Sequence, residues 1–139
     1  MSLGFDVFRG GVRSIARVIL FGIVGALAVR SARAAVTLVQ HAGKDAGTTT
    51  SSTLAFPSSN TAGNFIAVAV RAGTLNQLVT VTDTRGNTYR RALQANAPLD
   101  GVTLALYYAE AIAGGANTVT VADTLSGGTL RFAIFEYAG

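Results

Sequence analysis

The feature that most constrains this chain is a series of short segments in which β-branched residues alternate with polar ones. In residues 78–83 and 117–123 the valines fall on one face of an extended strand, and most of the threonines fall on the other. A period of two is typical of antiparallel strands with one face buried and the other in water. Glycine, asparagine, aspartate or proline interrupts each segment, and no convincing helical pattern lies between them.

This pattern predicts eight strands. We expect them at residues 36–41, 53–56, 64–71, 78–83, 88–92, 102–111, 117–123 and 129–138. Residues 64–70, 104–109 and 130–137 are apolar on both faces, which is typical of central strands or of strands covered by another surface. The predicted fold is therefore all-β, an antiparallel two-sheet β-sandwich, jelly-roll-like, of about eight strands.

An apolar run near the N-terminus removes the first quarter of the chain from this fold. Twelve residues, 18–29, follow Arg9, Arg13 and Arg17 and lead to the small-residue triplet at 32–34. The run is shorter than the about 20 residues that a membrane-spanning helix needs, and it lacks the polar face of an amphipathic surface helix. We interpret the segment as the signal helix of a secretory signal peptide.

The signal peptide sets the predicted boundaries and compartment. We expect cleavage between Ala34 and Ala35, so that residues 1–34 are the signal peptide and residues 35–139 the β-sandwich domain. The protein is then secreted or at the cell surface, and contacts a membrane only through the signal peptide before cleavage. Because the sequence stops at Gly139, directly after an apolar strand, we also expect a domain truncated at its C-terminus.

Charge and cysteine content exclude several classes of protein. The whole chain has a formal net charge of +4, but five of its eleven basic residues lie in 1–34, and the other six face six acids in 35–139. A neutral domain lacks the basic surplus typical of nucleic-acid-binding proteins, so we expect no nucleic acid partner. There is no cysteine and only one histidine, which excludes disulfides and a His/Cys metal site.

Several segments, taken in order, resemble a known family. They are 56–64, Asp-x-x-Gly-Asn-x-Tyr at 83–89, Tyr-Tyr-Ala-x-x-Ile-x-Gly-Gly-x-Asn-Thr-Val-Thr-Val at 107–121, and Glu-Tyr-Ala-Gly at 136–139. The set is similar to bacterial secreted jelly-roll-like domains, which form single or repeated β-sandwich modules of exported surface proteins and mostly have no assigned activity. The resemblance implies an architecture and a compartment, and it supplies no catalytic residues.

The sequence contains no convincing catalytic constellation. His41 is the only histidine and no Gly-x-Ser-x-Gly elbow accompanies it, so a solvated residue at a strand end is the simpler interpretation. Glu110 and Glu136 are the only glutamates, and they form a glycoside hydrolase pair only if their strands are neighbours. The alternative is that Glu136 pairs with Arg131 or Arg71, or lies at an edge in solvent.

Aspartates at strand ends are the only candidate metal ligands. Asp83 and Asn87 offer side-chain oxygens across one turn, as a calcium site requires, and Asp123 ends another strand. The same residue types also suit a tight turn, in which the aspartate accepts hydrogen bonds from the backbone two residues on. These residues thus predict calcium as the one possible cofactor, and turn formation is the simpler alternative for them.

Tyrosines are the candidate ligand-binding residues. Tyr89, Tyr107, Tyr108 and Tyr137 could pack a ring against the apolar side of a sugar and bond its hydroxyls. Tyr107 and Tyr108 must point to opposite faces of one strand, so we expect one in the core and the other exposed. Because the chain has no tryptophan, roles in the core or in strand pairing remain alternatives for all four.

The predicted function follows from these residues. We expect an exported, non-catalytic β-sandwich module of a bacterial cell-surface or secreted protein, with a structural, adhesive or carbohydrate-binding role and a glycan or protein partner. The alternative is a truncated secreted hydrolase of the glycoside hydrolase kind with the same architecture.

Overall fold

The computed structural model describes residues 35–125 and 128–139, and every regular element in these ranges is a strand. The strands are β1 (Thr37–Thr48), β2 (Ser51–Ala55), β3 (Phe65–Ala72), β4 (Thr80–Asp83), β5 (Arg90–Ala97), β6 (Val102–Ala109), β7 (Thr118–Ala122) and β8 (Thr129–Ala138). Within these ranges no helix is long and apolar enough to cross a membrane. The predicted signal peptide, 1–34, with its cleavage residue Ala34, lies outside the described residues.

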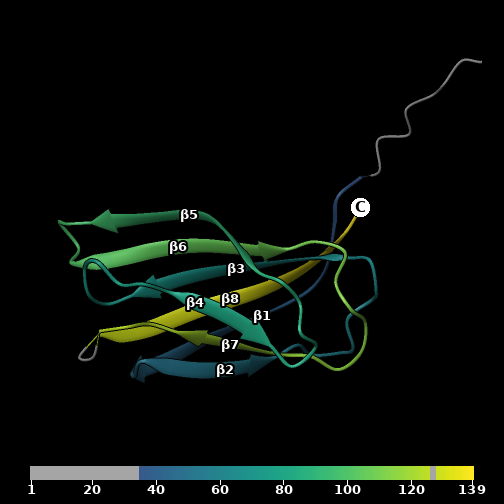
Figure 1. Cartoon of the computed structure of the whole chain (residues 1–139), viewed down its shortest axis with the longest axis horizontal. Helices are drawn as coiled ribbons and strands as arrows, with labels where there is room; N and C mark the ends of the chain where they lie inside the picture. Colours follow the sequence, from purple (N-terminus) through teal and green to yellow (C-terminus); the bar gives the residue numbers. More distant parts are fainter. Residues whose placement is uncertain (1–34, 126–127) are drawn as a thin grey trace, which may run out of the picture. The chain divides into compact units, whose positions relative to one another are not determined.

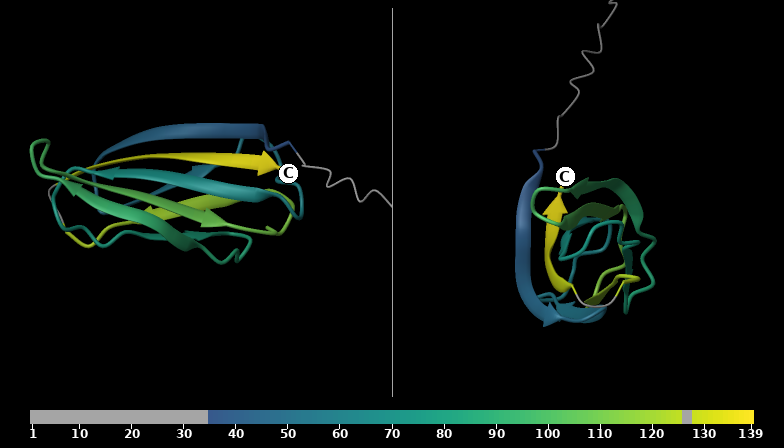
Figure 2. Two further views of the ribbon diagram at one scale, coloured as in Figure 1. Left: turned by 90° about the horizontal axis from the view of Figure 1, so that it is seen from above. Right: turned by 90° about the vertical axis from the view of Figure 1, so that its left-hand side faces the viewer.

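The strands form two antiparallel sheets (Figure 1). One has five strands in the order β1-β8-β3-β6-β5, and the other has three in the order β2-β7-β4. Viewed end-on, the two sheets enclose a common interior (Figure 2). The predicted all-β class, the antiparallel pairing and the number of strands are confirmed.

The sandwich is built almost entirely from connections that change sheet. Of the seven connections between consecutive strands, only β5 to β6 stays within one sheet, and the other six cross to the opposite sheet. Apart from β5 and β6, neighbours in a sheet are therefore not consecutive in the sequence, as in the pairing of β1 with β8. Side chains that lie far apart along the chain consequently share each face.

Two edge strands differ most from their predicted lengths. The strand predicted at 36–41 continues to Thr48, and the strand predicted at 88–92 runs from Arg90 to Ala97. Both lie at the edges of the five-stranded sheet, where one side of the backbone faces water and polar residues and glycine are tolerated. Their composition therefore lacks the apolar alternation on which the prediction depended.

The central strands supply the core. Ile66 and Val68 of β3, Ile134 of β8 and Val119 and Val121 of β7 are fully buried between the sheets. Burial of each such side chain contributes about 1.5–3 kcal/mol. The three segments with two apolar faces are β3, β6 and β8, which confirms their predicted central position.

The opposite side of β3, β6 and β8 faces away from the three-stranded sheet, and we call it the outer face. Its side chains are Phe65, Ala67, Ala69, Arg71, Leu104, Leu106, Tyr108, Arg131, Ala133, Phe135 and Tyr137. This face is open: Leu104 and Leu106 are 45% and 40% exposed. An apolar surface of this kind on a sheet is typical of a binding surface.

Candidate functional site

One end of the outer face carries a cluster of aromatic rings. Alternation along β8 places Phe135 and Tyr137 on this face, and the strand register sets His41 of β1 opposite Phe135 and Phe65 of β3 opposite Tyr137. Tyr108 of β6 completes the group by stacking on Phe65. We call these five residues the aromatic cluster.

The rings of the aromatic cluster pack against one another. Centroids are 6.1 Å apart for His41 and Phe135, 6.3 Å for Phe135 and Tyr137, and 5.7 Å for Phe65 and Tyr108. The interplanar angles of the three pairs lie between 14° and 27°. Such pairs stabilise one another by about 0.5–1.5 kcal/mol beyond the area that they bury. The cluster is therefore ordered before any ligand arrives.

The aromatic cluster remains accessible. Tyr108 and Tyr137 are partly exposed, and their hydroxyls make no hydrogen bond with other residues of the described ranges. An apolar pocket of about 420 Å³ adjoins Tyr137, and its lining consists of Phe65 and Tyr137 together with Val36, Ala138 and Gly139. Ring faces, free hydroxyls and an apolar pocket thus meet at one end of the sheet.

The structure separates the four candidate tyrosines. Tyr107 is 7% exposed and its hydroxyl donates to the Val79 carbonyl, whereas Tyr108 lies on the outer face, so the predicted division between them is confirmed. Tyr89 packs against the core, and its hydroxyl donates to Asp83 Oδ2 at 2.9 Å. Only Tyr108 and Tyr137 offer a ring to a ligand on the outer face.

Asp83 organises the turn after β4. Its Oδ1 accepts the backbone N–H groups of Arg85 and Asn87, both at 3.0 Å. Its Oδ2 accepts from Asn87 Nδ2 at 2.7 Å, Asn117 Nδ2 at 2.9 Å and the Tyr89 hydroxyl. The carboxylate joins the turn to the loop before β7, as the turn alternative requires.

The same contacts bear on the candidate calcium site. Burial alone would raise the pKa of Asp83, but the hydrogen bonds from Asn117, Asn87 and Tyr89 outweigh it and hold the pKa below its usual value. Burial, followed by the contact with Asp83, raises the pKa of Tyr89. Donors face both carboxylate oxygens, and the described ranges hold no cluster of three or more His, Asp or Glu side chains. Both Asp83 oxygens therefore serve the turn and its neighbouring loop.

Glu136 is the most buried charged residue of the described ranges, and its surroundings correct the prediction for it. Its side chain is fully buried and pairs with neither Arg131 nor Arg71. Instead Oε2 accepts from Gln40 Nε2 at 2.5 Å and Asn60 Nδ2 at 2.7 Å, while Oε1 accepts from Thr61 N at 2.8 Å and Asn64 Nδ2 at 2.7 Å.

These four donors stabilise a buried anion. Burial alone would raise the pKa of Glu136, but the hydrogen bonds outweigh it and hold the pKa below its usual value. The carboxylate thereby ties β1 and the segment before β3 to the end of β8. Glu136 has a structural role at this end of the sandwich.

The two glutamates do not face each other across a cleft. Glu110 directly follows β6 and Glu136 lies on β8, but β3 separates these strands in the sheet. The Glu110 side chain is 61% exposed and contacts Arg90 at 3.5 Å, while Glu136 is buried. The glycoside hydrolase alternative thus lacks the paired carboxylates on which it rested.

The prediction for His41 was right about exposure and wrong about position: the residue is exposed, but β1 continues to Thr48, so the histidine lies within the strand. The aromatic cluster as a whole was missed, since Phe65 and Phe135 were not considered as ligand-binding residues. The available signals were the two apolar faces of their strands and the aromatic pair at 135 and 137.

No protein-family model matches this chain, and neither the curated proteins nor the solved structures include a significant match to it. The resemblance to secreted jelly-roll-like domains therefore rests on the motif residues themselves.

Proposed function

We propose that this protein is an exported, non-catalytic, jelly-roll-like β-sandwich module of a bacterial surface or secreted protein, and that it binds a glycan at the aromatic cluster. The signal helix expected within residues 18–29 supports export. The motif resemblance supports a bacterial surface location.

The aromatic cluster is the observation that carries glycan binding. Four strands of one sheet contribute its five rings, which form a preassembled apolar surface with two unoccupied phenol hydroxyls. The apolar face of a sugar ring packs on an aromatic ring, and its hydroxyls bond to phenols at the ring edge. In general, a small number of ordered polar groups on an otherwise apolar surface orients a small ligand.

A glycan array with the purified protein tests the proposal. We expect binding to at least one oligosaccharide, and loss of that binding in Tyr108→Ala/Tyr137→Ala. The control is Leu99→Ala, because Leu99 is a fully exposed apolar residue in the turn between β5 and β6. Absence of binding to every glycan, or equal binding by the double tyrosine variant, would refute the proposal.

A further inference from the structure

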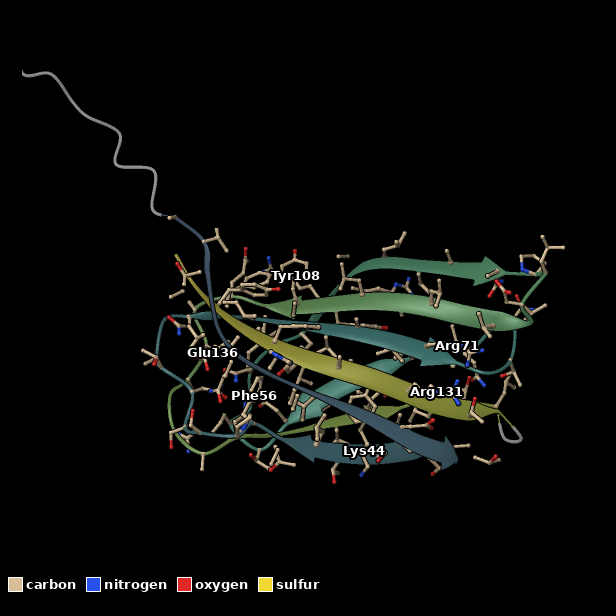
Figure 3. All side chains as sticks on the ribbon, turned by 180° about the vertical axis from the view of Figure 1, so that it is seen from behind. Lys44, Phe56, Arg71, Tyr108, Arg131 and Glu136 are labelled. Carbon is tan, nitrogen blue, oxygen red and sulfur yellow. The ribbon has the colours of Figure 1, made fainter. Side chains whose placement is uncertain are left out.

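An open cleft continues the outer face away from the aromatic cluster. Its volume is about 370 Å³, and the side chains of Ala69, Arg71, Leu104, Arg131 and Ala133 line it. Figure 3 shows Arg71 and Arg131 together at the end of the sheet opposite Tyr108 and Glu136. The outer face thus has an aromatic end and a basic end.

The two arginines are placed against electrostatic preference. Arg71 of β3 and Arg131 of β8 are direct partners in the strand register and lie on the same face. Like charges directly opposite each other on neighbouring strands destabilise a sheet. An anion bound between them would relieve that repulsion.

The neighbouring side chains only partly neutralise this pair. Arg131 Nε donates to Asp45 Oδ2 at 2.7 Å, and its two Nη atoms make no hydrogen bond in the described ranges. Arg71 makes a long contact of 3.5 Å to Thr129 Oγ1, and no described carboxylate forms a salt bridge with it. The one exposed carboxylate near this pair, Asp45, thus forms a salt bridge with only one of the two guanidinium groups.

The surface as a whole also favours an anion. Asp123 and Glu136 are buried, and Asp83 is half-buried with both of its oxygens hydrogen-bonded inside the protein. Of the six acids in 35–139, two are buried and four are not, whereas none of the six basic side chains is buried. Although residues 35–139 are neutral overall, their solvent-accessible charged side chains thus include more basic than acidic ones.

The two ends of the outer face lie within reach of one extended ligand. Arg131 and Tyr137 are six residues apart on β8, which corresponds to about 20 Å along a strand. The outer side chains between the two ends of β3 and β8 include Ala67, Ala69 and Ala133, whose small size leaves the path open. An oligosaccharide of several rings can contact both ends.

We propose that the glycan is acidic and that Arg71 and Arg131 bind its carboxylate or sulfate groups while the aromatic cluster packs against its sugar rings. The planar guanidinium fork matches both anions, because each presents two oxygens to parallel N–H donors. This inference rests on the proposed function, and it adds the chemical class of the ligand.

Matched pairs of polymers test the charge requirement. We compare dextran sulfate with dextran, and polygalacturonate with its methyl ester, for binding to the purified protein at low ionic strength. We expect the charged member of at least one pair to bind more tightly, with an affinity that falls as salt is added. The pair that shows the difference identifies sulfate or carboxylate as the preferred group.

Substitutions then assign the charge requirement to the cleft. Arg71→Gln/Arg131→Gln should lose about tenfold or more in affinity for the charged polymer, as expected for lost hydrogen bonds between charged groups. The control Arg85→Gln/Arg91→Gln removes the same charge from two exposed positions that do not line the cleft. Equal losses in both double variants would indicate general charge attraction and overturn the inference.

Other outcomes separate this inference from the proposed function. Neutral and charged polymers that bind equally, and that are both lost in Tyr108→Ala/Tyr137→Ala, would support glycan binding and overturn the acidic class. If binding of the charged polymers is lost only in the arginine variant, the result would support an anion-binding cleft and refute glycan binding at the aromatic cluster. A higher melting midpoint in inorganic sulfate, without binding of any polymer, would overturn the acidic glycan and leave an anion site alone.

Discussion

Replacing Glu136 by glutamine should lower the free energy of unfolding by far more than the removal of one charge suggests. The fully buried carboxylate faces only donors: Oε2 accepts from Gln40 and Asn60, and Oε1 from Thr61 N and Asn64. An amide turns one of these oxygens into a donor. Two hydrogen bonds then become contacts between donors, whichever oxygen is replaced.

Relaxation can relieve only part of this conflict. The Thr61 N–H belongs to the backbone, and Gln40 is held because its Oε1 accepts from the Ser58 backbone N–H at 3.0 Å and the Ser58 hydroxyl at 2.9 Å. Whichever oxygen becomes the amide nitrogen, one donor that is held in place, the Thr61 N–H or the Gln40 amide, therefore still faces it. With about 1.5–3 kcal/mol for each hydrogen bond to a charged group, partly offset by the easier burial of an amide, we expect a loss of about 3 kcal/mol.

Urea unfolding at pH 7 measures this loss against Glu110→Gln, whose exposed pair with Arg90 should contribute less than about 1 kcal/mol. The native pKa of Glu136 lies below its unfolded value of 4.5, so the unfolded state takes up the proton first as the pH falls. The stability from Glu136 is thus complete above about pH 5 and declines below it. Two outcomes would refute this reasoning. One is a Glu136→Gln variant as stable as Glu110→Gln, and the other is a Glu136→Gln variant whose stability declines below pH 5 as it does in the unsubstituted protein.

Three further predictions concern other polar groups that are buried or half-buried. Asp123 is 9% exposed, its carboxylate oxygens have no partner in the described ranges, and burial raises its pKa. Asp123→Asn should therefore stabilise the protein by about 1 kcal/mol at pH 7, as measured by urea unfolding. The gain should shrink as the pH falls toward 4, because the native carboxyl then becomes protonated. Tyr107→Phe should cost about 1–3 kcal/mol in the same assay, because it leaves the Val79 carbonyl buried without its donor. Added calcium should leave the melting midpoint unchanged, because donors already face both Asp83 oxygens; a calcium-dependent rise that Asp83→Asn abolishes would contradict this.

Local chemistry made the strands predictable. The alternation of valine and threonine, and the turn residues after it, are properties of neighbouring residues, and they placed β4 and β7 within two residues of their observed limits. The same logic predicted that Tyr107 and Tyr108 lie on opposite faces, and the structure shows that Tyr107 is the interior one. It failed for β1 and β5, because an edge strand is stabilised by its single partner rather than by an apolar pattern of its own.

The sequence by itself therefore determined the all-β class, the strand number and the turn at Asp83, all of which depend on short-range periods. Only the tertiary structure decided the aromatic cluster, the opposed arginines and the donors around Glu136. The three side-chain amides that donate to Glu136 lie 72 to 96 residues away from it along the chain. The physical reason is the topology. Six of the seven connections change sheet, so strand register, and not proximity along the chain, selects which side chains meet.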